Sequence, residues 1–193
     1  MFRRCFCAVA AVFLLTGCSA VKNPEEIAAS VRDVYSAASS IETVADITSD
    51  LNEETMTYQI GYDYEKKEGT ATAVMTVLAP ESIAGIQAEV TGEDVTFSYD
   101  GTELETAMPD RKGLTPADVT TYLLYDLMNT VPEQVWMEGE LLALRFEEVT
   151  DECTAVKEVY LNAETGALSE ARIYCDGKQI MRCTFASCTL NGK

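Results

Sequence analysis

The side chains that could carry chemistry in this 193-residue chain are limited first by what is missing: it has seven cysteines but no histidine. Without histidine, Ser-His-Asp and Cys-His catalysis are excluded, as is every zinc site that uses an imidazole ligand. Catalysis by paired carboxylates stays open, since 32 acidic residues could supply a pair, but nothing in their spacing singles one out. We therefore predict no catalytic residue, no metal site and no cofactor, and we do not expect an enzyme.

Cys18 has the clearest chemical setting of the seven cysteines. It follows two basic residues, Arg3 and Arg4, and an apolar run over residues 5–14, and it ends the tetrapeptide Leu-Thr-Gly-Cys. This layout resembles a bacterial lipoprotein signal, or lipobox, which implies that Cys18 becomes an N-terminus acylated with chains such as palmitate. The apolar run is shorter than the ~20 residues that span a bilayer. An uncleaved signal anchor or an ordinary secretory peptide is the alternative.

The lipobox divides the chain into a signal peptide (1–17), the lipidated cysteine with a short linker (18–23) and one domain (24–193). Two or three acyl chains anchor a protein stably, so we expect it on the cell membrane, facing outside the cytoplasm. Removing residues 1–17 takes away two basic residues and no acidic ones, which leaves a net charge near −20. That charge argues against nucleic acid as a partner and against electrostatic adhesion to anionic lipids. A monomer is expected.

The four remaining cysteines are Cys153, Cys175, Cys183 and Cys188. If the turn at 162–166 places Leu161 opposite Ala167, then Cys153 faces Cys175 at about the 4.5–5.5 Å Cα separation that a disulfide needs. Cys183 and Cys188 lie ~17 Å apart along one extended strand and cannot bridge. We predict one disulfide, Cys153–Cys175. The alternative that all four are reduced stays open, whereas a zinc site is disfavoured because no C-x₂-C pair occurs.

These residues must be positioned by an alternation of helices and strands. Asn23, Pro24 and Glu26 predict the start of a helix over about 24–40, whose apolar face includes Ala38 and Ile41. From Thr43 onward the period becomes 2. Thr115 predicts a second helix with Pro116 at its first position, ending before residue 132. The predicted strands are 54–66, 70–78, 84–91, 95–99, 103–106, 134–138, 141–149, 153–161, 167–175 and 178–188.

This order of elements predicts an α+β fold with one large, strongly curved antiparallel sheet and two main helices against its concave face. The stretch from Thr76 to Ile86, the turn at 99–101, the hairpin at 162–166 and the lipobox are similar to the LolA/LolB-like lipoprotein-carrier superfamily. The resemblance covers most of residues 24–188. It implies an unclosed β-barrel whose helices cover an apolar cavity that receives acyl chains.

The inward strand positions are rich in methionine and aromatic side chains, which suit an adaptable apolar site. The candidate cavity residues are Met56, Tyr58, Ile60, Tyr62, Met75, Val77, Ile86, Val90, Phe97, Leu144 and Phe146. The alternative is that they form the core beneath the helices. We therefore expect a non-catalytic envelope lipoprotein that binds acyl chains of lipids or lipoproteins. A second hypothesis is a regulatory or interaction lipoprotein, whose fold is a platform for a basic protein or cell-wall partner.

Overall fold

The computed structural model describes residues 23–52, 54–92, 94–107, 112–151 and 153–192. The predicted signal peptide, the predicted acylation site Cys18 and nearly all of the 18–23 linker lie outside these residues. Of the helices in the described part of the chain, none combines the length and the apolar character that crossing a membrane requires.

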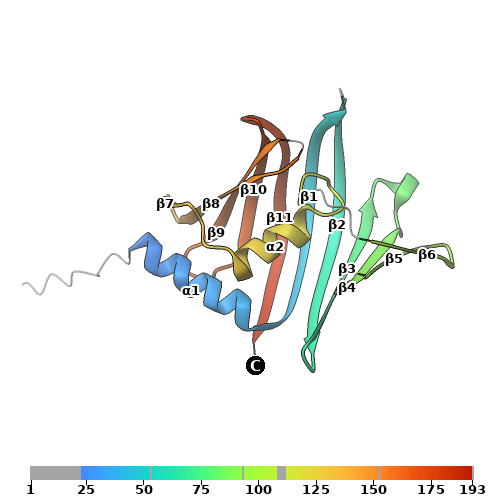
Figure 1. The fold of residues 1–193 in the computed structure, drawn as a ribbon, viewed down its shortest axis with the longest axis horizontal. Helices are drawn as coiled ribbons and strands as arrows, with labels where there is room; N and C mark the ends of the chain where they lie inside the picture. The colour runs from blue at the N-terminus through green and yellow to red at the C-terminus, as the bar shows by residue number, and fades with distance from the viewer. Residues whose placement is uncertain (1–22, 53, 93, 108–111, 152, 193) are drawn as a thin grey trace, which may run out of the picture.

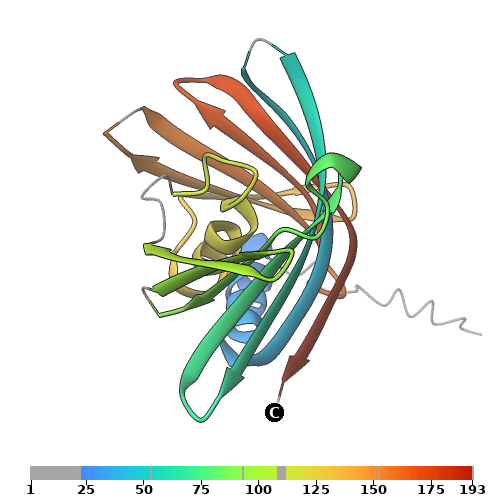
Figure 2. The same ribbon diagram turned by 90° about the vertical axis from the view of Figure 1, so that its right-hand side faces the viewer.

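Within the described residues, eleven antiparallel strands form one sheet in the order β6-β5-β4-β3-β2-β1-β11-β10-β9-β8-β7. The sheet curves strongly around the two helices without closing, and β6 and β7 are its two edges (Figures 1 and 2). The predicted unclosed antiparallel sheet is confirmed. The strands are β1 (Ala38–Asn52), β2 (Glu54–Lys67), β3 (Thr70–Ala79), β4 (Gln87–Thr91), β5 (Asp94–Tyr99), β6 (Thr102–Ala107), β7 (Gln134–Glu138), β8 (Leu141–Val149), β9 (Thr154–Asn162), β10 (Leu168–Cys175) and β11 (Lys178–Gly192).

The α-helices α1 (Pro24–Ala37) and α2 (Val119–Asn129) lie on the concave side of the sheet (Figure 2). Asn23 caps α1, because its side-chain oxygen accepts a hydrogen bond from the Glu25 amide at 3.3 Å. Tyr35 of α1 is fully buried, and its hydroxyl donates to the Gly166 carbonyl at 3.0 Å. This bond ties the helix to the turn between β9 and β10. A short 3-10 helix, η1 (Glu81–Ile83), joins β3 to β4.

The first helix is shorter than predicted, and β1 follows it without a break. Ala38 and Ile41, which the sequence placed on the helical face, are inward residues of β1. Their spacing of three residues fits a helix, but the buried positions Ile41, Thr43, Ala45 and Ile47 alternate as in a strand. The β-branched residues in this stretch favour the extended conformation, which explains why the helix ends at Ala37.

The second helix also begins later than predicted, at Val119 rather than at Pro116. Residues 115–118 form a turn in which the Val119 amide donates to the Thr115 carbonyl at 3.0 Å. The Asp118 carboxylate accepts hydrogen bonds from the Thr115 amide at 2.9 Å and from its hydroxyl at 2.6 Å. Thr115 and Asp118 are therefore hydrogen-bonded to each other, but their bonds close a turn that precedes α2.

The register between β9 and β10 differs from the predicted one by two residues, because Cys175 faces Ala155 instead of Cys153. A register shift between Leu168 and Glu170 accounts for part of the difference. Cys153 lies just before β9, and its Cα is 5.7 Å from that of Cys175, with which it forms a disulfide. Cys183 is buried as a free thiol and Cys188 is a half-buried one. Burial raises the pKa of the Cys183 thiol to about 12.

Candidate functional site

An apolar groove of about 530 Å³ runs between α2 and the strands on one side of it. This volume is within the usual range of about 300–1,000 Å³ for small-ligand sites. Its sheet wall comes from β2, β3 and β4, with the side chains of Tyr62, Tyr64, Ala71, Ala73 and Val90. Its helix wall is formed by Thr121, Leu124, Tyr125 and Met128. Most of the groove's lining surface is apolar.

Small residues on β3 explain why this part of the concave face is hollow. Ala73 pairs with Tyr64, and Ala71 pairs with Lys66. The side chain at each of these two inward positions is a single methyl group, whereas the next inward residue of β3, Met75, has a long side chain. On the other side of β3, Ala73 pairs with Val90. The alanines leave space above the sheet that Leu124 and Met128 of α2 cover only in part. The groove is thus a consequence of side-chain size on one strand.

Two tyrosines give the groove a polar component. Burial raises the pKa of the Tyr62 hydroxyl, and a hydrogen bond with the Thr121 side chain offsets this only in part. Burial also raises the pKa of Tyr64. Both hydroxyls therefore stay protonated at neutral pH and can act as hydrogen-bond donors or acceptors. An apolar ligand with an ester or hydroxyl group at one end matches this arrangement.

The predicted cavity residues are divided between the core and the groove. Five of them are buried in the core: Ile60, Tyr62, Met75, Leu144 and Phe146. Three others are partly buried and pack on that core: Tyr58, Val90 and Phe97. Val77 and Ile86 are half-buried, Ile86 lies just before β4, and Met56 is 43% exposed. Among all eleven, Tyr62 and Val90 line the groove. A binding role for all eleven stays a prediction.

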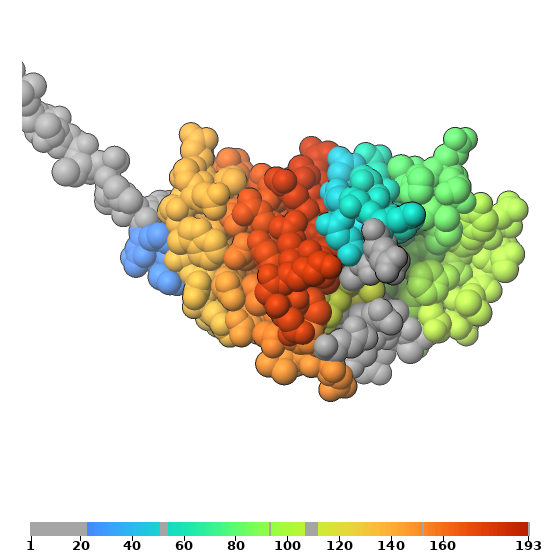
Figure 3. Space-filling view, turned by 90° about the horizontal axis from the view of Figure 1, so that it is seen from above, coloured from blue at the N-terminus to red at the C-terminus, as the bar shows by residue number. Residues whose placement is uncertain are grey.

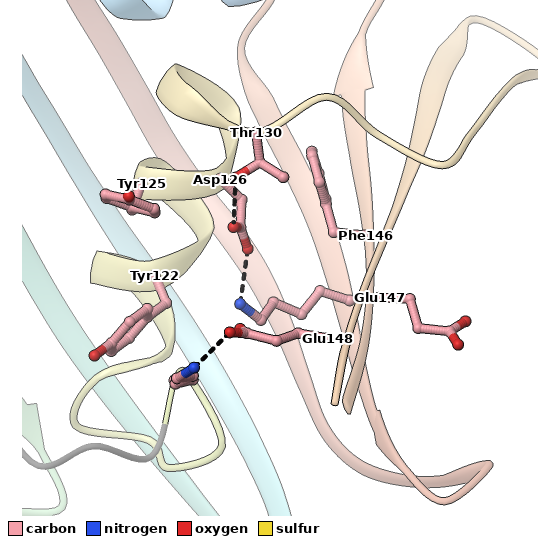
Figure 4. Close-up of a pocket in the computed structure, with 9 residues that line it drawn as sticks. Tyr122, Tyr125, Asp126, Thr130, Phe146, Glu147 and Glu148 are labelled. Carbon is pink, nitrogen blue, oxygen red and sulfur yellow. Dashed lines mark hydrogen bonds and ion pairs between the residues drawn. The ribbon is translucent and has the colours of Figure 1, made fainter. Parts of the chain in front are cut away.

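A second cavity, of about 440 Å³, lies on the opposite side of α2 and is lined by several charged side chains (Figure 4). Asp126 points from α2 toward the sheet, where its carboxylate lies 2.7 Å from Lys157 Nζ of β9. The Lys157 side chain is only 3% exposed, and its ammonium lies 5.5 Å from the centre of the Tyr122 ring. Lys112 and Glu148 form a second ion pair at 2.6 Å at the same cavity. Tyr125 lines both this cavity and the apolar groove.

The buried Asp126–Lys157 pair was not predicted, although the sequence carries a signal for it. Lys157 occupies an inward position between Ala155 and Val159, and Asp126 lies between two apolar residues of α2. A charged side chain on the buried face of a helix or strand requires a partner of opposite charge. Because the two charges neutralise each other, the cavity offers no unpaired buried acid. Among the described residues, no group of three or more potential ligand side chains could hold a metal ion.

Comparison with known proteins places this architecture among solved structures. The resemblance implied an unclosed antiparallel sheet with two helices, and the structure has this architecture. The structure of an uncharacterized conserved protein from Thermus thermophilus matches with a TM-score of 0.51 and 12% identity, covering 89% of this chain and 90% of that one. No protein-family model matches the chain, and no curated protein sequence resembles it significantly.

Two further solved structures overlap with most of the chain at lower TM-scores. One is a LolA superfamily protein from Nitrosomonas europaea, with 8% identity, a TM-score of 0.46, and coverage of 89% of this chain and 95% of that one. The other is a chain in the structure of the CwlD amidase from Clostridioides difficile in complex with the GerS lipoprotein. It has 16% identity, a TM-score of 0.48, and coverage of 86% and 95%. At these identities the likeness concerns the fold.

Proposed function

We propose that this protein is a cell-envelope lipoprotein, anchored through acylated Cys18, that binds acyl chains of lipids or lipoproteins without catalysing a reaction. The apolar groove between α2 and strands β2–β4 is the observation that supports the proposal. It combines the volume of a small-ligand site with walls of tyrosine, alanine, leucine and methionine.

The groove suits a flexible apolar chain better than a rigid polar ligand. Met128 and Leu124 can repack around chains of different length, because methionine in particular adapts its shape at low cost. The hydroxyls of Tyr62 and Tyr64 supply hydrogen bonds for an ester or amide group at the end of such a chain. The site contains no charged side chain, which matches a neutral ligand segment.

The test is native mass spectrometry of residues 19–193, purified without detergent from a host that contains membranes. We expect adducts at lipid masses that organic solvent removes. The variant Ala71→Phe fills the groove and should reduce the lipid-bound fraction by roughly tenfold, since it displaces contacts with about two methylene groups. Val74→Phe adds the same ring to the opposite face of β3, so its bound fraction should match that of the unmodified protein.

The mass spectra of the unmodified protein and of the two phenylalanine variants test both lipid binding and its location. A bare protein mass in repeated preparations would contradict lipid binding. Adducts that persist equally in both variants would show that lipid binds elsewhere, and the assignment of the groove would then be wrong. Thermal unfolding of both variants shows whether any loss of lipid reflects the groove or a damaged fold.

A further inference from the structure

The two edges of the sheet are protected to different degrees. The β7 edge is five residues long, follows Pro132 closely and packs against α1. No comparable packing of a helix on β6 is found among the described residues. Figure 1 shows β6 at the end of the sheet farthest from α1. An exposed edge strand can pair with another extended segment, because its outer backbone groups lack strand partners.

The hairpin between β5 and β6 determines which backbone groups face this edge. Asp100 and Gly101 both have positive φ angles, 49° and 76°, as in a type I′ turn. The turn makes Tyr99 and Thr102 a hydrogen-bonded pair, and such pairs alternate with non-hydrogen-bonded ones along an antiparallel ladder. The amide and carbonyl groups of Glu103 and Glu105 therefore point outward to the free edge.

Few of the usual devices that block an edge are present on β6. The strand has no lysine and no proline, and its pairing with β5 is regular from Asp94 to Tyr99. Leu104 is 64% exposed and Tyr99 is 51% exposed, which leaves apolar contact area next to the edge. The side chains of Glu103 and Glu105 are exposed on the opposite face. The edge thus offers backbone partners, apolar surface and negative charge together.

The charge of this region specifies the kind of partner. Between Lys67 and Arg111 the sequence contains no basic residue, while it contains the acidic residues Glu68, Glu81, Glu89, Glu93, Asp94, Asp100, Glu103, Glu105 and Asp110. Figure 3 shows that the green and yellow-green segments of this part of the chain form one end of the molecule. Two copies of such an edge would place like charges opposite each other, which is destabilising.

We propose that β6 is a docking edge for an extended, cationic segment of a partner protein, which adds to the sheet as an antiparallel or parallel strand. Backbone bonds to Glu103 and Glu105 supply affinity, as in other complexes formed by strand addition. The acidic side chains select lysine and arginine in the partner. This inference does not depend on the ligand of the apolar groove, because the edge and the groove share no lining residue.

The test uses a short, capped peptide in which lysine alternates with valine, and a matched peptide with glutamate in place of lysine. Amide hydrogen exchange by NMR on residues 19–193 should show protection of Glu103 and Glu105 with the lysine peptide alone. E103Q/E105Q should weaken the binding of this peptide by roughly tenfold. Glu105→Pro should abolish it, because proline removes an edge donor while edge strands tolerate proline.

The matched control is E138Q/E140Q near the β7 edge, which makes the same change in net charge and should leave peptide binding unchanged. Equal weakening by both double variants would show a non-specific charge effect and would overturn the proposal. So would the absence of binding at every soluble peptide concentration. Protection of Glu103 and Glu105 that rises with protein concentration alone would identify a second copy as the occupant, which also contradicts the proposal.

Discussion

A single carboxylate on α2 and a single lysine on β9 meet in the interior beneath the helix. Asp126 also accepts a hydrogen bond from the Thr130 hydroxyl at 3.2 Å, so both carboxylate oxygens have partners. Charges removed from water are costly, and here each one depends on the other for compensation. The pair fixes the position of α2 over the sheet because a shift of the helix would leave Lys157 without its counter-charge.

Removal of one member of this pair should therefore be much more damaging than removal of both. We expect Asp126→Ala to lower the free energy of unfolding by about 3–5 kcal/mol, since it leaves a buried, uncompensated ammonium. The double variant D126L/K157M should lose far less. Urea denaturation followed by circular dichroism measures all three proteins.

The matched control for this prediction is the more exposed pair Lys112–Glu148 at the same cavity. Glu148→Ala should change the free energy of unfolding by less than about 1 kcal/mol, as is usual for exposed ion pairs. If Asp126→Ala were no more destabilising than Glu148→Ala, the buried pair would not hold α2 in place.

At the scale of elements, the hairpin formed by β9 and β10 is closed at both ends. The turn at 162–166 joins the strands, and the Cys153–Cys175 disulfide connects their other ends across 22 residues of sequence. Alkylation of residues 19–193, unfolded without reductant, should label two thiols, those of Cys183 and Cys188. Cys153→Ala/Cys175→Ala should lower the free energy of unfolding by about 2–4 kcal/mol through the greater freedom of the unfolded chain. Labelling of four thiols in freshly prepared protein would show that the cysteines are reduced.

The elements differ in how well the sequence predicted them. Strands β7 to β10 were predicted to within a residue at each end, because turn residues such as those at 162–166 and 176–177 separate regular two-residue alternation. The start of β1 was not predicted, since Ala38 and Ile41 fit both periodicities. The groove could not be found from the sequence either. The groove depends on how α2 is placed over Ala71 and Ala73. The residue pattern of a single strand does not determine that placement.

At the scale of the whole molecule, charge is distributed unevenly between the two halves of the sheet. In the half formed by β8 to β11, acidic residues pair with arginines: Glu170 binds Arg172 at 2.5 Å and Arg182 at 2.6 Å. Burial by itself would raise the pKa of Glu170, but the hydrogen bonds from Arg182 and Arg172 outweigh it, so the pKa is lowered. In the half that contains β3 to β6, no basic residue separates the acidic ones between Lys67 and Arg111.

Salt should consequently act in opposite directions on the two halves. Screening weakens repulsion among the acidic residues around β4 to β6, and it also weakens the partly exposed ion pairs of Glu170 with Arg172 and Arg182. We expect amide exchange in β4 to β6 to slow between about 0.01 M and about 1 M salt, over which the Debye length falls from about 30 Å to about 3 Å. Exchange in β10 should stay constant or quicken. Hydrogen exchange with mass spectrometry at both concentrations resolves the two regions, with potassium chloride and sodium chloride compared to separate screening from specific ion binding. A uniform slowing across all strands would instead indicate that salt acts on apolar burial throughout the fold, and the uneven charge would then have no influence on local stability.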